Sequence, residues 1–290
     1  MERNLNGDKM KEKRIGNDEM KAIELDIMRE LYRVCHEEGL KCIMAYGTLL
    51  GAIRHHGFIP WDDDIDLIMP REDYERLPEA FAKLSSKPYY KIIWYRDRSS
   101  IYPFIKVVDT RTEVIEHYVD ERWCRTGVWV DVFPADGIGQ SDKTFEDVAR
   151  LRRKYDYLTA NIHESSSTVN LLGKRVLKAI MPKEDIYQIA QQLDDIARAV
   201  PLAESREAAN IAWAVGPNER MPKIHRIRYL PLRFRRRAVR RPERLRHLPH
   251  ALVWRLHDAA ARGPAHPSLR RRPLALDVRT GDEGSRAASI

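Results

Sequence analysis

The stretch RHHGFIPWDDDIDLIMP, residues 54–70, gathers four carboxylates, Asp62, Asp63, Asp64 and Asp66, within five residues. Apolar side chains stand on both sides of these aspartates, so the segment is suited to burial although its charges repel one another. A divalent cation would cancel this repulsion, and without one a carboxyl group should take up a proton. The stretch therefore predicts a rigid, metal-binding entrance to a buried strand.

The spacing of Asp64 and Asp66 matters because alternate side chains of a strand share one face. We expect both carboxylates to point the same way while Ile65 enters the core. Two carboxylates so arranged can chelate a hard cation such as Mg²⁺ or Mn²⁺, with water and phosphate oxygens filling the remaining positions. An Asp-x-Asp pair alone is weak evidence, since its alternative is a solvated turn.

Two further segments strengthen the prediction of a metal and phosphate site. Gly47 and Thr48 lie at an expected strand-to-helix turn, where free backbone N–H groups and the Thr48 hydroxyl can receive a phosphate. Asp131 lies inside the apolar run VWVDVFP, where a lone acid is costly unless it meets a cation or a donor. Laid beside the first strand, Asp131 would complete a site of three carboxylates with Asp64 and Asp66.

Two basic residues are candidates for contacts with a substrate phosphate. Arg54 lies in the last turn of the helix after Gly47, and its alternative is an ion pair with the aspartates. Lys106 lies on a later strand, and its alternative is a solvated strand position. Asp62 and Asp63 are expected to surround the metal site from outside or to be solvated, and not to bind the ion directly.

Apolar periodicity predicts an α+β front half followed by a helical region. Helices are expected at 17–38, 47–56, 71–84, 143–158 and 184–200, and strands at 41–45, 65–69, 90–96, 102–108, 112–116 and 127–134. The sequence ADG, residues 135–137, is expected to turn the chain. We divide the protein into a polar N-terminal extension (1–16), a core (17–140), a helical region (141–223) and an arginine-rich tail (224–290).

Composition narrows the class of protein. No stretch approaches the roughly 20 apolar residues of a membrane span, and the polar start lacks the apolar segment of a signal peptide. The three cysteines, Cys35, Cys42 and Cys124, form no close pair, so we expect reduced core thiols and no disulfide framework. These features favour a cytoplasmic protein.

The tail differs sharply from the rest of the chain. Residues 224–290 hold 17 Arg, no Lys and 5 acids, a net +12, which leaves −4 for residues 1–223 out of the overall +8. The tail has no sustained helical or alternating period, and its composition resembles GC-rich DNA translated out of frame. That interpretation is favoured over an ordinary disordered tail and over a basic arm for nucleic acid, so nucleic acid is not an expected partner.

The motif GTLLGAIRHHGFIPWDDDIDLIM, followed by WVDVFPADG, resembles the LicD phosphorylcholine-transferase family, relatives of the fukutin group within the nucleotidyltransferase superfamily. The resemblance runs from Met20 to about Asp136, and more loosely to Lys223. It implies the nucleotidyltransferase fold, in which a short mixed sheet is flanked by helices. It also implies the roles of a Gly-Ser-type turn for Gly47-Thr48, of an Asp-x-Asp for Asp64 and Asp66, and of a third carboxylate for Asp131.

The implied activity is the metal-dependent transfer of a phosphocholine-like group. The donor would be CDP-choline or a related CDP-alcohol, and the acceptor a hydroxyl of a cell-surface glycan such as teichoic acid or lipopolysaccharide. A choline headgroup needs an aromatic cage, for which Trp61, Tyr102, Trp123 and Trp129 are candidates. Family members continue with an aromatic, Gly-rich segment where this chain has its arginine-rich tail, which would impair the activity.

Two alternatives remain open. The first keeps the fold and transfers a nucleoside monophosphate to a small hydroxylated acceptor, with release of pyrophosphate. The second is an inactive or nucleic-acid-binding chain governed by its tail, in which binding would depend on salt and not on the aspartates.

Overall fold

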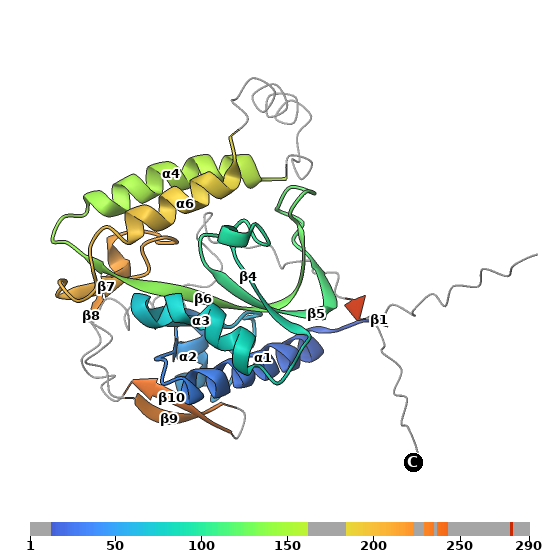
Figure 1. Cartoon of the computed structure of the whole chain (residues 1–290). Coiled ribbons are helices and arrows are strands. Elements are labelled where there is room, and N and C mark those ends of the chain that lie inside the picture. Colours follow the sequence, from blue (N-terminus) through green and yellow to red (C-terminus); the bar gives the residue numbers. More distant parts are fainter. Residues whose placement is uncertain (1–12, 162–183, 223–228, 235–236, 243–278, 281–290) are drawn as a thin grey trace, which may run out of the picture.

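The computed structural model describes residues 13–161, 184–222, 229–234, 237–242 and 279–280 of the 290-residue chain. A mixed sheet crosses the molecule, with helices on both of its sides (Figure 1). Helices α4 (Lys143–Thr159) and α6 (Ile186–Ala197) cover one side, and α1 (Asn17–Glu37), α2 (Tyr46–Arg54) and α3 (Arg71–Leu84) lie on the other. The predicted short mixed sheet flanked by helices is confirmed.

The centre of the sheet is built from strands that the sequence places far apart. Strand β3 (Asp66–Pro70) pairs antiparallel with β2 (Ile43–Met44) and parallel with β6 (Arg125–Ile138). Strand β6 pairs antiparallel with β5 (Ile105–Ile115), which pairs with β4 (Tyr90–Ile93). The parallel pairing of β3 and β6 brings the aspartate motif beside the apolar run VWVDVFP, which contains Asp131.

Two of the expected strand boundaries were wrong. The strands expected at 102–108 and 112–116 form the single strand β5, whose pairing with β6 shifts register between Asp109 and Val114. The turn expected at 135–137 is instead the end of β6, which pairs there with β7 (Glu207–Ala209). The expected helical region therefore also contains strands, because β7 pairs in turn with β8 (Met221–Pro222).

The apolar faces predicted for the helices form the core. Leu31 of α1, Ile105 of β5 and Val130 of β6 are fully buried in one cluster between the sheet and the first three helices. The opposite face of the sheet carries Phe104 and Phe133, whose rings lie 4.5 Å apart. Burying this much apolar surface is the main term that stabilises the fold.

A buried charge network attaches α6 to the core. Arg71, at the start of α3, binds Asp136 on β6 with an Nε–Oδ1 distance of 2.6 Å and Asp194 on α6 with an Nη1–Oδ1 distance of 2.9 Å. Both aspartates are 1% exposed, so removing Arg71 would leave two buried charges without their main partner. The short helix η1 (Tyr95–Asp97) joins the network, because Arg96 also pairs with Asp194.

Little of the arginine-rich tail belongs to the described part of the chain. Strands β9 (Tyr229–Phe234) and β10 (Arg237–Pro242) form an antiparallel hairpin, and β11 (Arg279–Thr280) pairs with β5 and with β1 (Lys13–Arg14). The rest of the tail, and with it the prediction of disorder, lies outside the described residues, as do residues 1–12. In the part of the chain that the structure describes, no helix is both long and apolar enough to cross a membrane.

Candidate active site

The structure brings Asp66 and Asp131 side by side. They are register partners on the parallel strands β3 and β6, and the Asp131 N–H donates to the Ile65 carbonyl with an N–O distance of 3.0 Å. Ile65 itself is fully buried, as the alternation of the strand requires. Two carboxylates from neighbouring strands therefore emerge at the same edge of the core, where the sequence predicted them.

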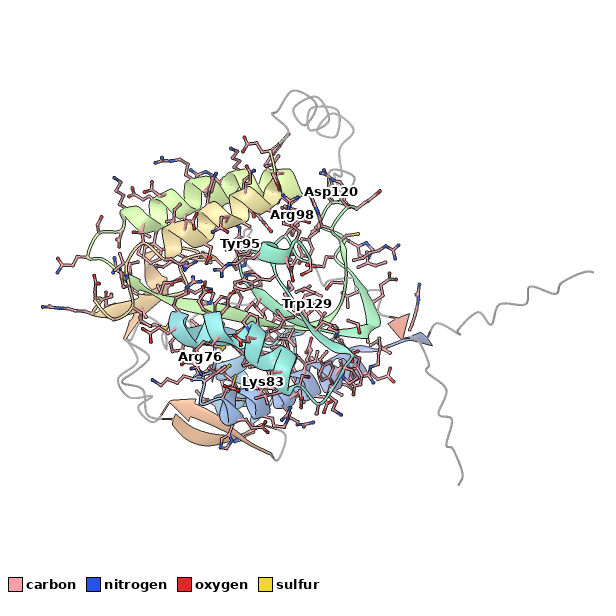
Figure 2. The ribbon with its side chains drawn as sticks, in the orientation of Figure 1. Arg76, Lys83, Tyr95, Arg98, Asp120 and Trp129 are labelled. Carbon is pink, nitrogen blue, oxygen red and sulfur yellow. The ribbon has the colours of Figure 1, made fainter. Side chains whose placement is uncertain are left out.

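Lys106 is the partner of Asp131 on the other neighbouring strand. It is the register partner of Asp131 between β5 and β6, and its Nζ lies 2.9 Å from Asp131 Oδ1. The ammonium also lies over the rings of Tyr102 and Trp129, 4.5 and 4.1 Å from their centroids, with Trp129 near the middle of the molecule (Figure 2). Lys106 is 3% exposed, so it is a buried counter-ion and not a solvated strand lysine.

The carboxyl group of Asp131 has a raised pKa. Burial raises its pKa to about 6, the Lys106 ammonium opposes that rise, and the negative charges of Asp64 and Glu116 add to it. Asp131 thus changes its charge close to neutral pH, where a group that accepts a proton during catalysis is most useful.

The Gly47-Thr48 turn holds the aspartate segment in place. The Thr48 hydroxyl is buried and accepts a hydrogen bond from the Asp66 N–H, with an Oγ1–N distance of 2.8 Å. A Cβ at Gly47 would lie 2.3 Å from Asp62 Oδ2, so only glycine lets that carboxylate approach the start of α2. The hydroxyl hydrogen of Thr48 and the first N–H groups of α2 can still donate to a phosphate.

The acidic side chains cluster differently from the prediction. Asp62, Asp63 and Asp64 offer carboxylate oxygens that all lie within 4.8 Å of one another, the one group of three acids, histidines or cysteines of this kind among the described residues. The predicted set of Asp64, Asp66 and Asp131 is not gathered as tightly. Asp62 and Asp63, which we expected to surround the metal site from outside or to be solvated, thus form this group together with Asp64.

Glu24 of α1 is a site residue that the sequence analysis missed. It is 3% exposed, and its Oε2 has no hydrogen-bond partner in the part of the chain that the structure describes. Burial, followed by the charges of Asp64 and Asp63, raises its pKa well above the ordinary value. The available signal was its position on the helix, because Glu24 stands four residues before Met28 in a stripe that is otherwise apolar.

This donor set fits a hard divalent cation. Carboxylate oxygens are the ligands that Mg²⁺ and Mn²⁺ prefer, and the site concentrates more carboxylates than the neighbouring lysines, Lys21 and Lys106, can neutralise. The buried Oε2 of Glu24, without a protein partner among the described residues, is the kind of atom that a bound cation or its water would satisfy.

Arg54 is not brought to the carboxylates. It is exposed at the C-terminal end of α2, and seven residues of helical rise place it roughly 10 Å along the axis from Gly47. Its Nε lies 3.5 Å from His55 Nδ1, and the His55 ring meets Trp61 edge-on.

The four aromatic candidates for a choline cage do not surround one site together. Trp61 is 73% exposed. Tyr102 and Trp129 share the Lys106 ammonium, and the Trp123 ring carries the Arg122 guanidinium 4.2 Å from its centroid. Protein cations thus already occupy ring faces that a choline headgroup would need.

Part of the chain matches a known protein family. Residues 39–163 match the family described as LicD/FKTN/FKRP, nucleotidyltransferase domain. The chain is 29% identical over 138 residues to the lipopolysaccharide cholinephosphotransferase LicD of Haemophilus influenzae, which is 47% of this chain and 50% of that protein. Uncharacterized proteins of Rickettsia typhi and Rickettsia prowazekii are 34% and 33% identical over 85 and 86 residues, 29% of this chain in both cases.

These matches confirm the resemblance that the motifs indicated. The matched segment contains the Gly47-Thr48 turn, the aspartates of β3, Lys106 and Asp131. The chain spans half the length of the Haemophilus protein, and 26% and 32% of the two Rickettsia proteins.

Proposed function

We propose that the LicD-type nucleotidyltransferase domain of residues 39–163 transfers a phosphocholine-like group from CDP-choline, or a related CDP-alcohol, to a hydroxyl of a cell-surface glycan. The observation that carries the proposal is the pairing of Asp66 with Asp131 on parallel strands, with Lys106 held 2.9 Å from Asp131. The reaction would take place in the cytoplasm before the glycan is exported. Lipopolysaccharide is the acceptor named for the Haemophilus relative.

The chemistry is an in-line displacement at phosphorus. The acceptor oxygen forms a bond to the phosphorus of the phosphocholine group, the bond from that phosphorus to the CMP oxygen breaks, and CMP leaves. The acceptor hydroxyl loses its proton to a base, and Asp131, with its pKa of about 6 in the absence of metal, would be that base in place of binding the ion.

The remaining residues position the donor. The N-terminus of α2 and the Thr48 hydroxyl offer donors to a phosphate, while the Thr48 oxygen fixes Asp66. Asp64 and Asp66, joined by Asp131 where it is a ligand and not the base, would hold Mg²⁺ or Mn²⁺, which when bound neutralises negative charge on the diphosphate. Lys106 supplies a second positive charge at the buried end of the site.

The decisive experiment follows the two halves of the donor. Purified protein is incubated with Mg²⁺, a crude glycan acceptor and CDP-choline labelled either in the choline or in the cytidine. We expect choline label on the glycan and free CMP in solution. Label from the cytidine on the acceptor, with choline phosphate released, would instead support the nucleotidyltransferase alternative.

Matched variants make the result specific to the site. Asp66→Asn should abolish transfer, whereas Asp156→Asn, an exposed aspartate of α4 paired with Arg152, should retain it. Equal activity of wild type and Asp66→Asn would contradict the proposal.

A further inference from the structure

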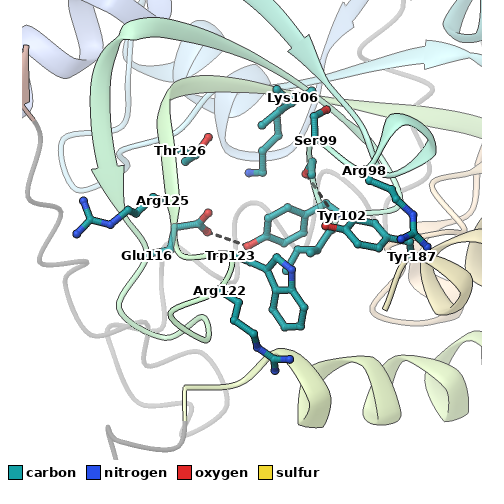
Figure 3. A pocket seen from close by; sticks show the side chains of 13 residues that line it. Arg98, Ser99, Tyr102, Lys106, Glu116, Arg122, Trp123, Arg125, Thr126 and Tyr187 are labelled. Carbon is teal, nitrogen blue, oxygen red and sulfur yellow. Dashed lines mark hydrogen bonds between the residues drawn. The ribbon is translucent and has the colours of Figure 1, made fainter. Parts of the chain in front are cut away.

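A cavity of about 180 Å³ lies next to Lys106 (Figure 3), and none of the aspartates of residues 62–66 lines it. The cavity is lined mainly by the loop between η1 and β5, by β5 itself, and by the connection between β5 and β6. The side chains important here are Ser99, Tyr102, Lys106, Glu116, Trp123 and Thr126. Because Lys106 Nζ lies 2.9 Å from Asp131, a molecule in the cavity would be one side chain away from the reacting centre.

Glu116 offers the cavity an unused hydrogen-bond acceptor. Its side chain is 2% exposed, and the hydroxyls of Tyr102 and Tyr118 both donate to its Oε2, at 2.8 Å for Tyr102. No hydrogen bond reaches Oε1 from any residue in the described part of the chain. This oxygen can accept a hydrogen bond from ordered water or from a ligand hydroxyl in the cavity.

Thr126 provides a second unused polar group. Its Oγ1 is buried and has no hydrogen-bond partner among the described residues. A hydroxyl can both donate and accept, and Lys106 adds a donor at the end of the cavity nearest Asp131. The cavity thus combines an acceptor, a hydroxyl and a donor.

The basic residues named in the cavity lining are each paired with an acid. Lys106 is paired with Asp131, and the arginines of the rim are paired with acids, Arg122 with Asp120 and Arg125 with Glu113. Figure 3 shows the Arg122 and Arg125 guanidinium groups pointing away from the middle of the cavity. Glu116 has no basic partner among the described residues and is held by two tyrosine hydroxyls, so it can accept further hydrogen bonds from the hydroxyls of a ligand.

We propose that this cavity is the acceptor subsite and binds one sugar ring of the glycan. Ring hydroxyls both donate and accept, which matches Glu116 Oε1, Thr126 Oγ1 and Lys106 Nζ, and the Trp123 ring offers an apolar wall. At roughly 30 Å³ per water, the volume equals about six waters, enough for a single ring. The inference rests on the proposed function, because it assigns the acceptor of the same reaction.

The test measures sugar binding without turnover. Saturation-transfer NMR on the full chain, without donor or metal, is recorded with methyl α-D-glucopyranoside, methyl β-D-galactopyranoside and methyl N-acetyl-β-D-glucosaminide as probes. We expect at least one probe to bind at millimolar concentration. Glu116→Gln and Thr126→Val should each weaken that binding at least fivefold.

The variants are chosen to separate binding from folding. Thr126→Val keeps the side-chain shape and removes a hydroxyl without a partner in the described structure, so its melting temperature should stay at or above that of the wild type. Glu113→Gln is the matched control, since Glu113 lies on β5, close to Glu116 in sequence, and does not itself line the cavity. Its partner Arg125 stands on the rim with its guanidinium group pointing away from the middle of the cavity. This control variant should bind the probe within twofold of wild type.

Three outcomes would overturn the inference: no probe binds to the wild type, both cavity variants bind as the wild type does, or choline chloride binds in place of the sugars and is lost in Glu116→Gln. Failure of the proposed function looks different. A protein that binds sugar through Glu116 and Thr126 but transfers no part of CDP-choline would contradict that function and leave the sugar site standing.

Discussion

Asp66 and Asp131 are direct register partners on two parallel strands, although 64 residues of sequence separate them. Like charges this close repel each other unless a cation or a proton intervenes. We therefore expect Asp66→Asn to lower the transfer rate at least about 100-fold, because it removes a ligand that acts on the reacting phosphate. The rate is measured with labelled CDP-choline at saturating donor and acceptor.

The same substitution should not unfold the protein. Removing one of two repelling charges leaves the Asp66 N–H bond to Thr48 intact, so the metal-free melting temperature should be unchanged or higher. Loss of activity accompanied by a large fall in melting temperature would point to a structural role for Asp66.

The Lys106–Asp131 pair gives a second prediction. Lys106→Met removes the cation from a fully enclosed pair and leaves Asp131 charged and buried, which should lower the free energy of unfolding by about 3–5 kcal/mol at pH 8. The double variant Lys106→Met/Asp131→Asn should regain most of this loss, since neither partner is then charged. Urea unfolding of the four members of the cycle measures the effect. Additive losses would show that the two side chains act independently.

The local part of this site could be predicted from the sequence. The alternation of Asp64, Ile65 and Asp66 and the lone acid within VWVDVFP are features of single strands, and the structure pairs those strands. The extent of α1 was predictable for the same reason. Its apolar stripe and the Gly39 that follows its end both belong to one continuous segment, so no distant partner is needed to recognise them.

Features that depend on distant partners were not predictable. Residues 135–137 have the composition of a turn, yet β7 pairs with them and Arg71 binds Asp136, which keeps them in a strand. The one local signal for Glu24 is its place in the apolar stripe of α1, and Glu116 has none. That folding buries the two glutamates beside Asp64 and Lys106 could not be read from either segment alone.

Metal binding should depend on pH through Asp131. Its pKa of about 6 means that the carboxyl holds a proton at pH 5 and has lost it at pH 7.5, and a cation must displace that proton to bind. We expect saturating Mn²⁺ to raise the melting temperature more at pH 7.5 than at pH 5. Differential scanning fluorimetry with and without Mn²⁺ at the two pH values measures the difference.

A comparison with and without metal isolates this effect. Asp136 also has a pKa raised to about 6 by burial, but it is paired with Arg71, so its titration affects both samples alike. The raised pKa of Asp131 itself makes the metal-free fold less stable as pH rises from about 4 to about 6, because the unfolded chain loses its proton first. An Mn²⁺ effect that is equal at pH 5 and pH 7.5 would contradict the assignment.

Two buried glutamates of α1 should respond in opposite directions to the same substitution. Glu24 is 3% exposed beside Asp63 and Asp64, and burial raises its pKa, so its charge destabilises the fold increasingly as pH rises above about 4.5. Glu24→Gln should therefore raise the metal-free free energy of unfolding at pH 7.5 by about 1–3 kcal/mol. It should also reduce the further stabilisation that Mn²⁺ provides.

Glu30 supplies the matched control on the same helix. It is 6% exposed, accepts hydrogen bonds from Arg33 Nη2 at 2.7 Å and from the Ser86 N–H at 2.6 Å, and the Arg33 bond lowers its pKa to about 2. Its charge stabilises the fold above pH 4.5, and that contribution is lost as pH falls toward 2. Glu30→Gln should thus lower stability at pH 7.5 and leave the Mn²⁺ effect unchanged. Chemical unfolding with and without Mn²⁺ tests both variants, and a loss of stability in Glu24→Gln with an undiminished Mn²⁺ effect would show that Glu24 does not face the cation.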